Sequence, residues 1–567
     1  MAAQYWTYRE MWDELRRLAS QYPHLMRVEV IGQSRQGRDM AGVTLTNFET
    51  GTSQARSAIL VDANIHAGEV AGNSTAMFWI QWCLHNYGIN PEATALLNDH
   101  AVYVIPRISL DGAELYLTTP LRVRSSPHLY PFSAPPEGFV EADVDNNGYC
   151  LMMRVQGEDG GFVEDELDPR VMRPRRPGEL GGTYYHLFPE GRIDRMAQSG
   201  KWPSLAQAGR ARRHEMDFNR NFPVRWAGES GQPGAGPFPL SEPELRSLAH
   251  FMDSHPNIAA YAALHTSGGV ILRQPSTGED TTLSPKDREL FTRVADMGAE
   301  VSGYFADSNF HIFDTGHEAV LMPGAADDWA YDHFGILSFT VEIWNLPRHA
   351  GARGYAELGL RQMMRLTPEE VTEDRRKVYD WVSREVPENG AFTWRPFQHP
   401  DFGEVEIGGL DPKFVVQNPP AHLLEEECAH VSGFLTRLGL SLPRLVVTAL
   451  TAEEEAESVY RVVVEVANAG YLPTSSTEKG EKLILEGLTA RIGGEVAIIA
   501  GSSPTALAHL YGYGAASDQE PPSRQRASVE WVVKAIAGTT LEVTVAGDRS
   551  GRISRTIVLG EAAYARS

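Results

Sequence analysis

His66 and Glu69 are side chains of the kinds that bind zinc, and they stand three residues apart. They follow the apolar run 58–63, which predicts a buried strand that ends in a turn. Two such side chains that leave one strand together can hold the same Zn²⁺ from one side. Catalytic zinc takes three protein ligands and keeps a fourth position open for water, so this pair predicts a third ligand far downstream.

The spacing alone is a weak signal, because solvated helix faces and loops produce it often. A histidine and an acid stand equally far apart at four other places: His214/Asp217, His250/Asp253, His311/Asp314 and His422/Glu425. The strand before His66 and the later segments described below distinguish the first pair.

The elements around this pair predict an α/β fold with a mixed central β-sheet flanked by helices. Apolar side chains at helical spacing alternate with short apolar runs, as layered α/β proteins require. The expected helices lie at 8–22, from 70 to about 83, and at 421–440, and the expected early strands at 28–31, 40–45, 58–63 and 101–105.

Residues 125–212 are rich in proline, glycine and charge, and we interpret them as an insertion that walls or roofs a site. The run from Asp143 to Gly148 resembles the first half of a calcium-binding loop. The twelfth position of such a loop is Glu, whereas Arg154 stands there. A tight turn is therefore predicted, and calcium binding by Asp143, Asp145 and Asn147 stays open.

The pattern changes at Pro443, after which alternating apolar residues and glycine-rich turns predict a small all-β sandwich. We divide the chain into a catalytic domain, 1–442, and a C-terminal β-sandwich domain, 443–567. The sandwich contains no cluster of catalytic residue types, so a folding partner or a binding surface is its expected role. Its strands are expected at 459–466, 529–536, 541–545 and 552–558.

Several later segments complete a pattern with the first pair. They are Pro106–Gly112, Asp217–Phe222, Ser241–Glu244, a strand that ends at His265, the segment Asp327-Asp328-Trp329, and a strand that ends at Glu342. With these motifs in this order, the chain resembles a zinc metallocarboxypeptidase of the carboxypeptidase A/B family over about residues 5–385. The segments 394–397 and 403–409 resemble those of a larger bacterial type of member.

The resemblance implies one Zn²⁺ per chain and a carboxypeptidase mechanism. His66, Glu69 and His265 would be the zinc ligands. Asp217 would accept the other ring N–H of His66 and fix its tautomer. Glu342 would be the general base for a water activated by the metal.

The resemblance also implies how a substrate would be held. Arg124, or Arg122 beside it, would stabilise the oxyanion. Asn219 and Arg220 would bind the terminal carboxylate, which makes the enzyme an exopeptidase. Asp327 would lie toward the base of the specificity pocket and favour C-terminal Lys or Arg, because a buried carboxylate needs a cationic partner.

Alternatives to this role of Asp327 remain open. Asp327 could cap a turn or pair with a nearby arginine, and Asp328 would take its place if the alignment slipped by one residue. Two positions depart from the family. Gly68 stands where an arginine is usual, and Val320 stands where a mobile tyrosine closes over the substrate, so closure must differ here.

The net charge of −23 argues against a nucleic-acid partner, because a polyanion would be repelled. No apolar run reaches the ~20 residues that span a bilayer, so no membrane partner is expected. Cys83, Cys150 and Cys428 form neither a disulfide framework nor a metal spacing, which predicts buried free thiols. No secretory signal is visible, so we expect a cytoplasmic protein, or a secreted one if a leader was removed.

Peptide or protein C-termini are thus the expected partners, and the oligomeric state is not predicted. A zinc amidase or endopeptidase acting on peptidoglycan stem peptides or modified side chains is an alternative, because it would share the zinc machinery. A non-catalytic binding protein with the same fold is a third reading. The joint presence of His66, Glu69, His265 and Glu342 argues against it.

Overall fold

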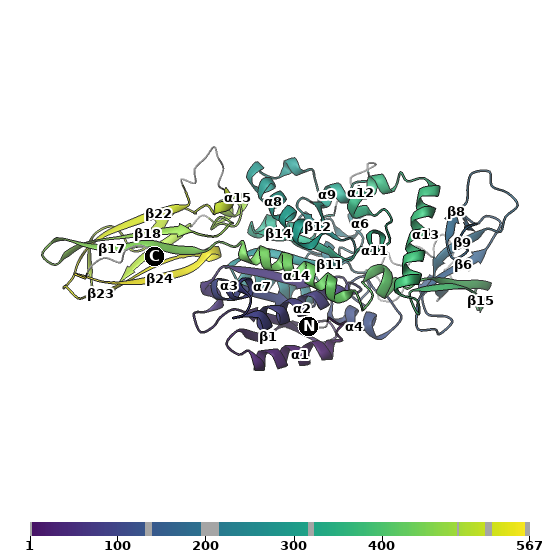
Figure 1. The fold of residues 1–567 in the computed structure, drawn as a ribbon, viewed down its shortest axis with the longest axis horizontal. Helices are drawn as coiled ribbons and strands as arrows, with labels where there is room; N and C mark the ends of the chain where they lie inside the picture. Colours follow the sequence, from purple (N-terminus) through teal and green to yellow (C-terminus); the bar gives the residue numbers. More distant parts are fainter. Residues whose placement is uncertain are drawn as a thin grey trace.

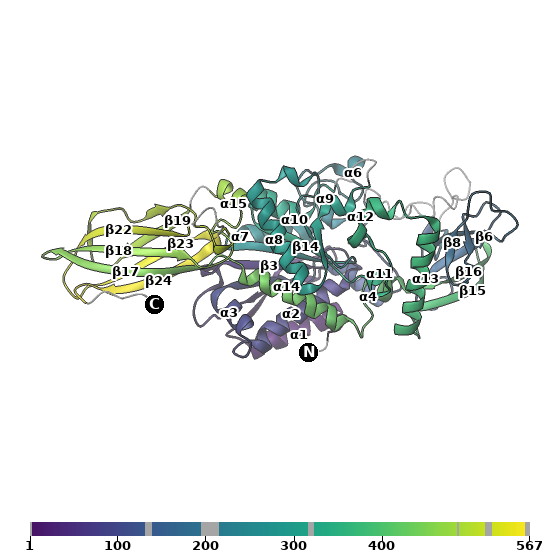
Figure 2. The same ribbon diagram turned by 45° about the horizontal axis from the view of Figure 1, so that its top comes forward.

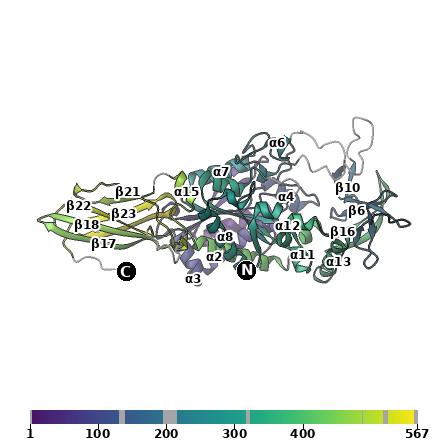
Figure 3. The ribbon, with the colours of Figure 1, turned by 90° about the horizontal axis from the view of Figure 1, so that it is seen from above.

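The computed structural model describes residues 3–130, 139–193, 215–315, 322–484, 487–515 and 524–561. The described chain forms three parts that follow one another along the long axis of the molecule (Figure 1). An α/β part lies in the middle, a separate β-sheet lies at one end, and an all-β part lies at the other (Figure 2). The view from above shows the same order (Figure 3).

A mixed eight-stranded sheet forms the centre of the α/β part, in the order β1-β2-β4-β3-β11-β14-β12-β13. Its strands are β1 (Met26–Gln33), β2 (Asp39–Leu45), β3 (Ala58–Ala63), β4 (Ala101–Ile105), β11 (Ile258–Thr266), β12 (Val270–Arg273), β13 (Phe305–Ser308) and β14 (Leu337–Ile343). β4, β3, β11 and β14 pair in parallel, whereas β2 is antiparallel to β4, and β12 is antiparallel to β14. The expected mixed α/β class is confirmed.

Strand β3 is buried on both faces, which explains why all of its residues except Asp62 are apolar. Ile59 and Val61 belong to a hydrophobic cluster with α1, α2 and α14, whereas Ala58 and Leu60 belong to a second cluster with α7. The sheet therefore separates two cores.

The helices of this part are α1 (Tyr8–Gln21), α2 (Val70–Asn86), α3 (Pro91–Asp99), α4 (Leu110–Thr118), α6 (Gly228–Gly231), α7 (Pro243–Ser254), α8 (Pro285–Ser302), α9 (Asn309–Phe313), α10 (Ala326–Trp329), α11 (Leu346–His349), α12 (Tyr355–Met363), α13 (Pro368–Glu385) and α14 (Leu424–Leu440).

The described part of the predicted insertion, residues 125–130 and 139–193, does not wall or roof the cleft described below, since none of those residues lines it. Its strands join a later hairpin in a six-stranded antiparallel sheet, in the order β15-β16-β6-β9-β7-β8. The segments 394–397 and 403–409 thus lie in strands that complete this sheet. The strands are β6 (Met152–Gln156), β7 (Phe162–Glu164), β8 (Met172–Pro174), β9 (Tyr185–Pro189), β15 (Ala391–His399) and β16 (Gly403–Leu410), and β5 (Phe139–Glu141) pairs separately with β10 (Gly191–Ile193).

The predicted tight turn at Asp143 is found. The backbone N–H groups of Asn147 and Gly148 donate to the Asp143 carboxylate at 3.0 and 2.9 Å. The neighbouring Asp145 also accepts from the N–H of Asn147, at 3.1 Å. These carboxylates hold the turn by side chain-to-backbone hydrogen bonds.

Two four-stranded sheets form the C-terminal part, in the orders β17-β18-β22-β20 and β21-β19-β23-β24. Apolar residues of both sheets share one hydrophobic cluster, so the sheets pack as a sandwich, as expected. The elements are β17 (Leu445–Ala456), β18 (Val459–Asn468), α15 (Glu478–Leu483), β19 (Leu488–Gly493), β20 (Ala497–Ala500), β21 (Thr505–Leu507), β22 (Arg526–Lys534), β23 (Thr540–Gly547) and β24 (Gly551–Val558).

The loop before α15 docks onto the starts of two central strands. The Ser476 hydroxyl donates to the carbonyl of Ala259 on β11 at 2.5 Å and accepts from the N–H of Leu337 on β14 at 3.0 Å. Thr477 donates to the carbonyl of Gly335 at 2.6 Å. Among the described residues, no helix is long and apolar enough to cross a membrane.

Candidate metal centre and substrate cleft

The predicted metal ligands converge where parallel strands end. His66 lies in the turn after β3, Glu69 is the residue before α2, and His265 lies near the end of β11. Because β11 pairs in parallel with both β3 and β14, the carboxyl ends of these strands meet at one edge. His265 stands directly opposite Glu342 in the register of β11 and β14.

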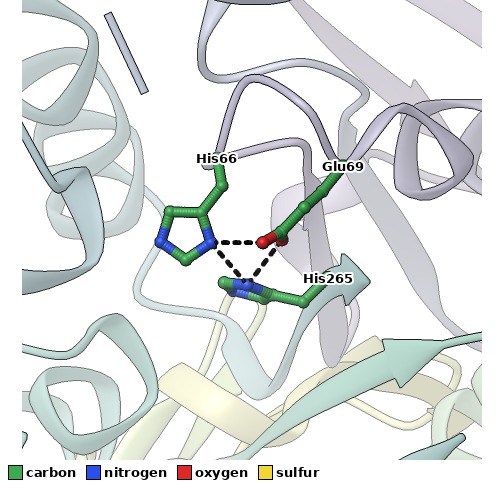
Figure 4. Close-up of side chains that lie close together, drawn as sticks. All are labelled: His66, Glu69 and His265. Carbon is green, nitrogen blue, oxygen red and sulfur yellow. Dashed lines mark hydrogen bonds and ion pairs between the residues drawn. The ribbon is translucent and has the colours of Figure 1, made fainter. Parts of the chain in front are cut away.

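The three side chains form a closed triangle of donor atoms (Figure 4). Nδ1 of His66 lies 2.8 Å from Oε1 of Glu69, and Nδ1 of His265 lies 2.9 Å from Oε2. The two Nδ1 atoms are 3.1 Å apart. All three side chains are buried. Two imidazole nitrogens and a carboxylate aimed at one point match the donor set of catalytic zinc, so these residues fit a zinc ion.

Asp217 lies behind this triangle. Its Oδ1 is 3.0 Å from Nε2 of His66, the ring nitrogen that faces away from Glu69. Its Oδ2 accepts a hydrogen bond from Nε of Arg124 at 3.1 Å. Burial alone would raise the pKa of Asp217, but the charges of Arg124 and His66 hold it well below the usual range. Asp217 is therefore a carboxylate that can fix the His66 tautomer.

Arg124, and not Arg122, lies at the centre. Nη1 of Arg124 donates to Oε1 of Glu69 at 3.2 Å. Burial lowers the pKa of Arg124, but the charges of Asp217 and Glu69 outweigh that effect and raise it. Arg122 instead forms a two-pronged ion pair with Glu141, at 2.7 and 3.0 Å. The tertiary structure thus separates two arginines that the sequence left as alternatives.

The pKa values of the two glutamates at the centre, Glu69 and Glu342, are shifted in opposite directions. Burial would raise the pKa of Glu69, but His66 and His265 lower it overall, so Glu69 is a carboxylate. Burial raises the pKa of Glu342 to about 8, and the nearby charge of Glu69 adds to the rise. Adjacent carboxyl groups with opposite shifts are typical of sites where one binds and the other moves a proton.

A cleft of about 430 Å³ opens beside the triangle. Besides the triangle itself, its wall contains Arg124, Asn219, Arg220, Gln232, Thr266, Ser267, Leu272, Ser276, Asn309, Phe313, Met322, Ala325, Asp327, Thr340, Glu342, Tyr355 and Leu360. The cleft is thus lined by the expected ligands and by Arg124, Asn219, Arg220, Asp327 and Glu342, whereas Asp217 and the alternatives Arg122 and Asp328 do not line it.

Asn219 and Arg220 lie in a short helical turn, Phe218–Arg220, that follows Asp217. The Asn219 side-chain oxygen accepts from the N–H of Ala326 at 2.8 Å, which leaves its amide N–H₂ as a donor. Among the described residues, the Arg220 guanidinium donates only to the carbonyl of Asn219, from Nη1 at 2.7 Å. Within the described residues, no carboxylate lies within 4.0 Å of the Arg220 guanidinium, so this cation faces the cleft without an ionic partner.

Asp327 also lines the cleft without an ionic partner among the described residues, and its side chain is buried. Its Oδ2 accepts from Nδ2 of Asn309 at 2.8 Å, and its Oδ1 accepts from the N–H of Asp328 at 3.0 Å. The neighbouring arginine, Arg225, pairs with Asp332 at 3.2 Å and lies 3.8 Å from Asp328. Asp328 does not line the cleft, and burial together with the charge of Asp327 raises its pKa well above the usual range.

Several residues in and around the cleft carried no signal in the sequence, among them Tyr355 and Gln417. Tyr355 lines the cleft from α12. Gln417, from a later turn, fills the space beside Gly68, where a Cβ would lie 2.6 Å from its Oε1. Both belong to segments without a motif, and only the folded chain brings them here. Val320, the position expected for a closing tyrosine, lies outside the described residues.

Comparison with known families gives two matches. The family model described as zinc carboxypeptidase matches residues 11–139 and 185–374, which is more than half of the chain. The unmatched residues 140–184 include strands of the six-stranded sheet. A second family, described only as a domain of unknown function (DUF8731), matches residues 444–558.

Individual relatives are more distant. Mouse carboxypeptidase A2 is 23% identical over 349 residues, which covers 60% of this chain and 62% of the mouse protein. Rat carboxypeptidase B2 is 30% identical over 142 residues, which covers 24% of this chain and 33% of the rat protein. The chain thus spans less than two thirds of the length of either relative.

Solved structures with a similar course include carboxypeptidase A from Helicoverpa armigera, with a TM-score of 0.38 and 15% identity over 68% of this chain and 75% of that one. Bovine thrombin-activatable fibrinolysis inhibitor, solved with a tick carboxypeptidase inhibitor, has a TM-score of 0.38 and 19% identity over 67% of this chain and 98% of that one. The family model matches more than half of the chain, and it agrees with the family that the sequence motifs indicated. This chain therefore belongs to the zinc carboxypeptidase family.

Proposed function

We propose that this chain is a zinc carboxypeptidase that hydrolyses the last peptide bond of peptides or proteins and favours C-terminal Lys or Arg. One observation carries the proposal. A single cleft holds a His₂Glu donor triangle, the Glu342 carboxyl group opposite His265, and a guanidinium without an ionic partner among the described residues. The first two suit a hydrolase, and the third suits a substrate with a free carboxylate at its end.

In this mechanism, a zinc ion held by His66, Glu69 and His265 supplies Lewis-acid chemistry at the scissile carbonyl. Glu342 accepts a proton from the attacking water and delivers it to the leaving amine. Arg124 donates to the carbonyl oxygen while negative charge develops there. Asp217, which is bonded to both His66 and Arg124, keeps these side chains oriented.

The substrate end is fixed by charge. Arg220 pairs with the terminal carboxylate, and the Asn219 amide adds a donor. Asp327 lies on the same cleft wall without an ionic partner among the described residues, so a cationic side chain stabilises it where a neutral one leaves it uncompensated. A C-terminal Lys or Arg pairs with Arg220 through its carboxylate and with Asp327 through its side chain.

A pair of peptides that end in Lys, one with a free C-terminus and one amidated, tests this function. The zinc-loaded chain should cleave the first and leave the second nearly intact. Arg220→Ala should lose on the order of 2–4 kcal/mol of transition-state stabilisation, measured as a fall in kcat/KM for the free peptide. An excess of chelator should abolish hydrolysis, and Zn²⁺ should restore it.

Two results would contradict the proposal. Equal cleavage of the free and the amidated peptide would point to an endopeptidase or an amidase, and stem peptides of peptidoglycan would then be the next substrates to assay. Full activity after verified removal of the metal would exclude the zinc mechanism.

We also propose a division of the chain into a catalytic domain, 1–442, and a C-terminal β-sandwich domain, 443–567. The strand pattern that begins with β17 and the separate family match over 444–558 support this boundary. The sandwich is proposed as a folding partner of the catalytic domain, because its loop supplies buried hydrogen bonds to β11 and β14.

A further inference from the structure

Tyr355 places a phenol on the wall of the cleft, at the first residue of α12. Its hydroxyl donates to the backbone carbonyl of Ser267, two residues beyond His265. Its ring packs against Phe313, another residue of the wall, with the ring centroids 5.8 Å apart. Apolar contacts thus anchor the ring, and the hydroxyl is the end that meets polar groups.

Gly268 leaves the space that this hydroxyl occupies. A Cβ at position 268 would lie 2.3 Å from the Tyr355 hydroxyl and 3.1 Å from the Cβ of Glu342. The N–H of Gly268 donates to the carbonyl of Trp344 at 2.6 Å, which holds this loop against the end of β14. The Tyr355 hydroxyl and the Cβ of Glu342 therefore both lie next to Gly268, and a side chain at 268 would push the phenol away.

Carboxyl groups near Tyr355 keep its phenol neutral. Burial raises the pKa of Tyr355 well above its usual range, and the charges of Glu342 and Glu69 raise it further. The phenol is therefore a neutral donor at any working pH. The hydrogen bond to Ser267 and the approach to Glu342 at Gly268 place the Tyr355 hydroxyl at the metal-and-base end of the cleft.

We infer that Tyr355 is a substrate-binding residue. When a substrate binds, the Tyr355 hydroxyl stops donating to the Ser267 carbonyl and donates instead to a carbonyl of the substrate. That carbonyl belongs to the amide immediately upstream of the scissile amide. The inference rests on the proposed function, because a terminal carboxylate at Arg220 sets the direction of the peptide. With that end fixed and the scissile bond beside Glu342, the residues upstream of the scissile bond pass the Tyr355 wall. One backbone carbonyl replaces another, so the donor stays satisfied throughout.

Two substrates that differ only upstream test this contact in the zinc-loaded full chain. N-acetyl-alanyl-lysine has the upstream carbonyl, and pentanoyl-lysine has methylene groups in its place. Tyr355→Phe should lower kcat/KM for acetyl-alanyl-lysine roughly 3- to 10-fold, the range for one neutral hydrogen bond, and leave the value for pentanoyl-lysine unchanged. Gly268→Ala should also lower the ratio of kcat/KM for acetyl-alanyl-lysine to kcat/KM for pentanoyl-lysine, because its Cβ displaces the Tyr355 hydroxyl.

Tyr8→Phe is the matched control, because the Tyr8 hydroxyl accepts from the N–H of Asp39 at 2.9 Å and does not line the cleft. This variant should leave the ratio unchanged. An equal loss on both substrates with Tyr355→Phe, or no loss on either, overturns the inference. A wild-type chain that hydrolyses neither substrate overturns the proposed function, and the inference with it.

Discussion

Glu342 is the single side chain on which the proposed chemistry depends most directly. It stands opposite His265 in the register of β11 and β14 but is not part of the donor triangle. Glu342→Gln keeps the shape of the side chain and removes the base, so kcat should fall by about 10²- to 10⁴-fold. Metal analysis of the variant should still find one zinc per chain. A kcat near that of the wild type would require another base and would contradict this role.

Asp327 should decide which C-terminal residue is preferred. The wild-type chain should cleave peptides that end in Lys or Arg faster than matched peptides that end in Leu, Phe or Glu. Asp327→Asn removes the charge, so the preference should fall roughly 30-fold or more, as expected for one side of a buried charge pair. Asp328→Asn is the matched control, because Asp328 lies on the same helix but not in the cleft. If only the Asp328 variant changes the preference, the assignment of Asp327 is wrong by one residue.

At the scale of elements, the spacing between α2 and β11 sets the distance between two of the proposed ligands. α2 begins directly after Glu69, and β11 carries His265. A Cβ at Gly72 would lie 2.8 Å from the carbonyl oxygen of Leu264, so Gly72→Ala must push the helix away from the strand. Overpacking of this kind costs about 1–3 kcal/mol.

Gly72→Ala should therefore lower both the unfolding temperature and the zinc affinity. Circular dichroism measures the first, and competition with a chromophoric chelator measures the second. Gly161→Ala is the control, since a Cβ there meets nothing within 4 Å. An unchanged zinc affinity in the Gly72 variant would show that the helix does not control the ligand geometry.

At the scale of the whole molecule, Arg549 of the sandwich reaches into the α/β part. Its buried guanidinium donates to the carbonyl of Gly335 at 3.1 Å, to that of Ser475 at 2.7 Å, and to that of Phe334. Arg549→Met leaves these buried carbonyls with fewer donors, so the free energy of unfolding should fall by roughly 2–4 kcal/mol.

The loss of stability should extend to the catalytic part. Thermal unfolding and residual hydrolysis after heating should therefore shift down together in Arg549→Met. Arg461→Met provides the control, because Arg461 on β18 forms surface ion pairs with Glu453, Glu455 and Glu530, and its loss should cost about 1 kcal/mol or less. If hydrolysis survives heating as in the wild type while the sandwich melts early, the two parts are independent, and the role of a folding partner is wrong.

Much of the fold and of the candidate site could be predicted from local patterns. The apolar run of β3, followed by His66 and Glu69, combines a strand signal and a chemical signal within a dozen residues. The strands that end at His265 and Glu342 do the same. Such signals survive in sequence because a parallel strand buried on both faces is apolar along its length, so a polar residue at its end stands out.

The tertiary structure decided what depends on contacts between distant segments. It placed Arg124 in the site and Arg122 on Glu141, although the two stand two residues apart. It joined the insertion to the hairpin β15–β16, and it brought Tyr355 to the cleft and Gln417 beside Gly68. Periodicity reports which face of an element is buried, but not which distant element covers it, because many partners of similar size and polarity would satisfy the same pattern.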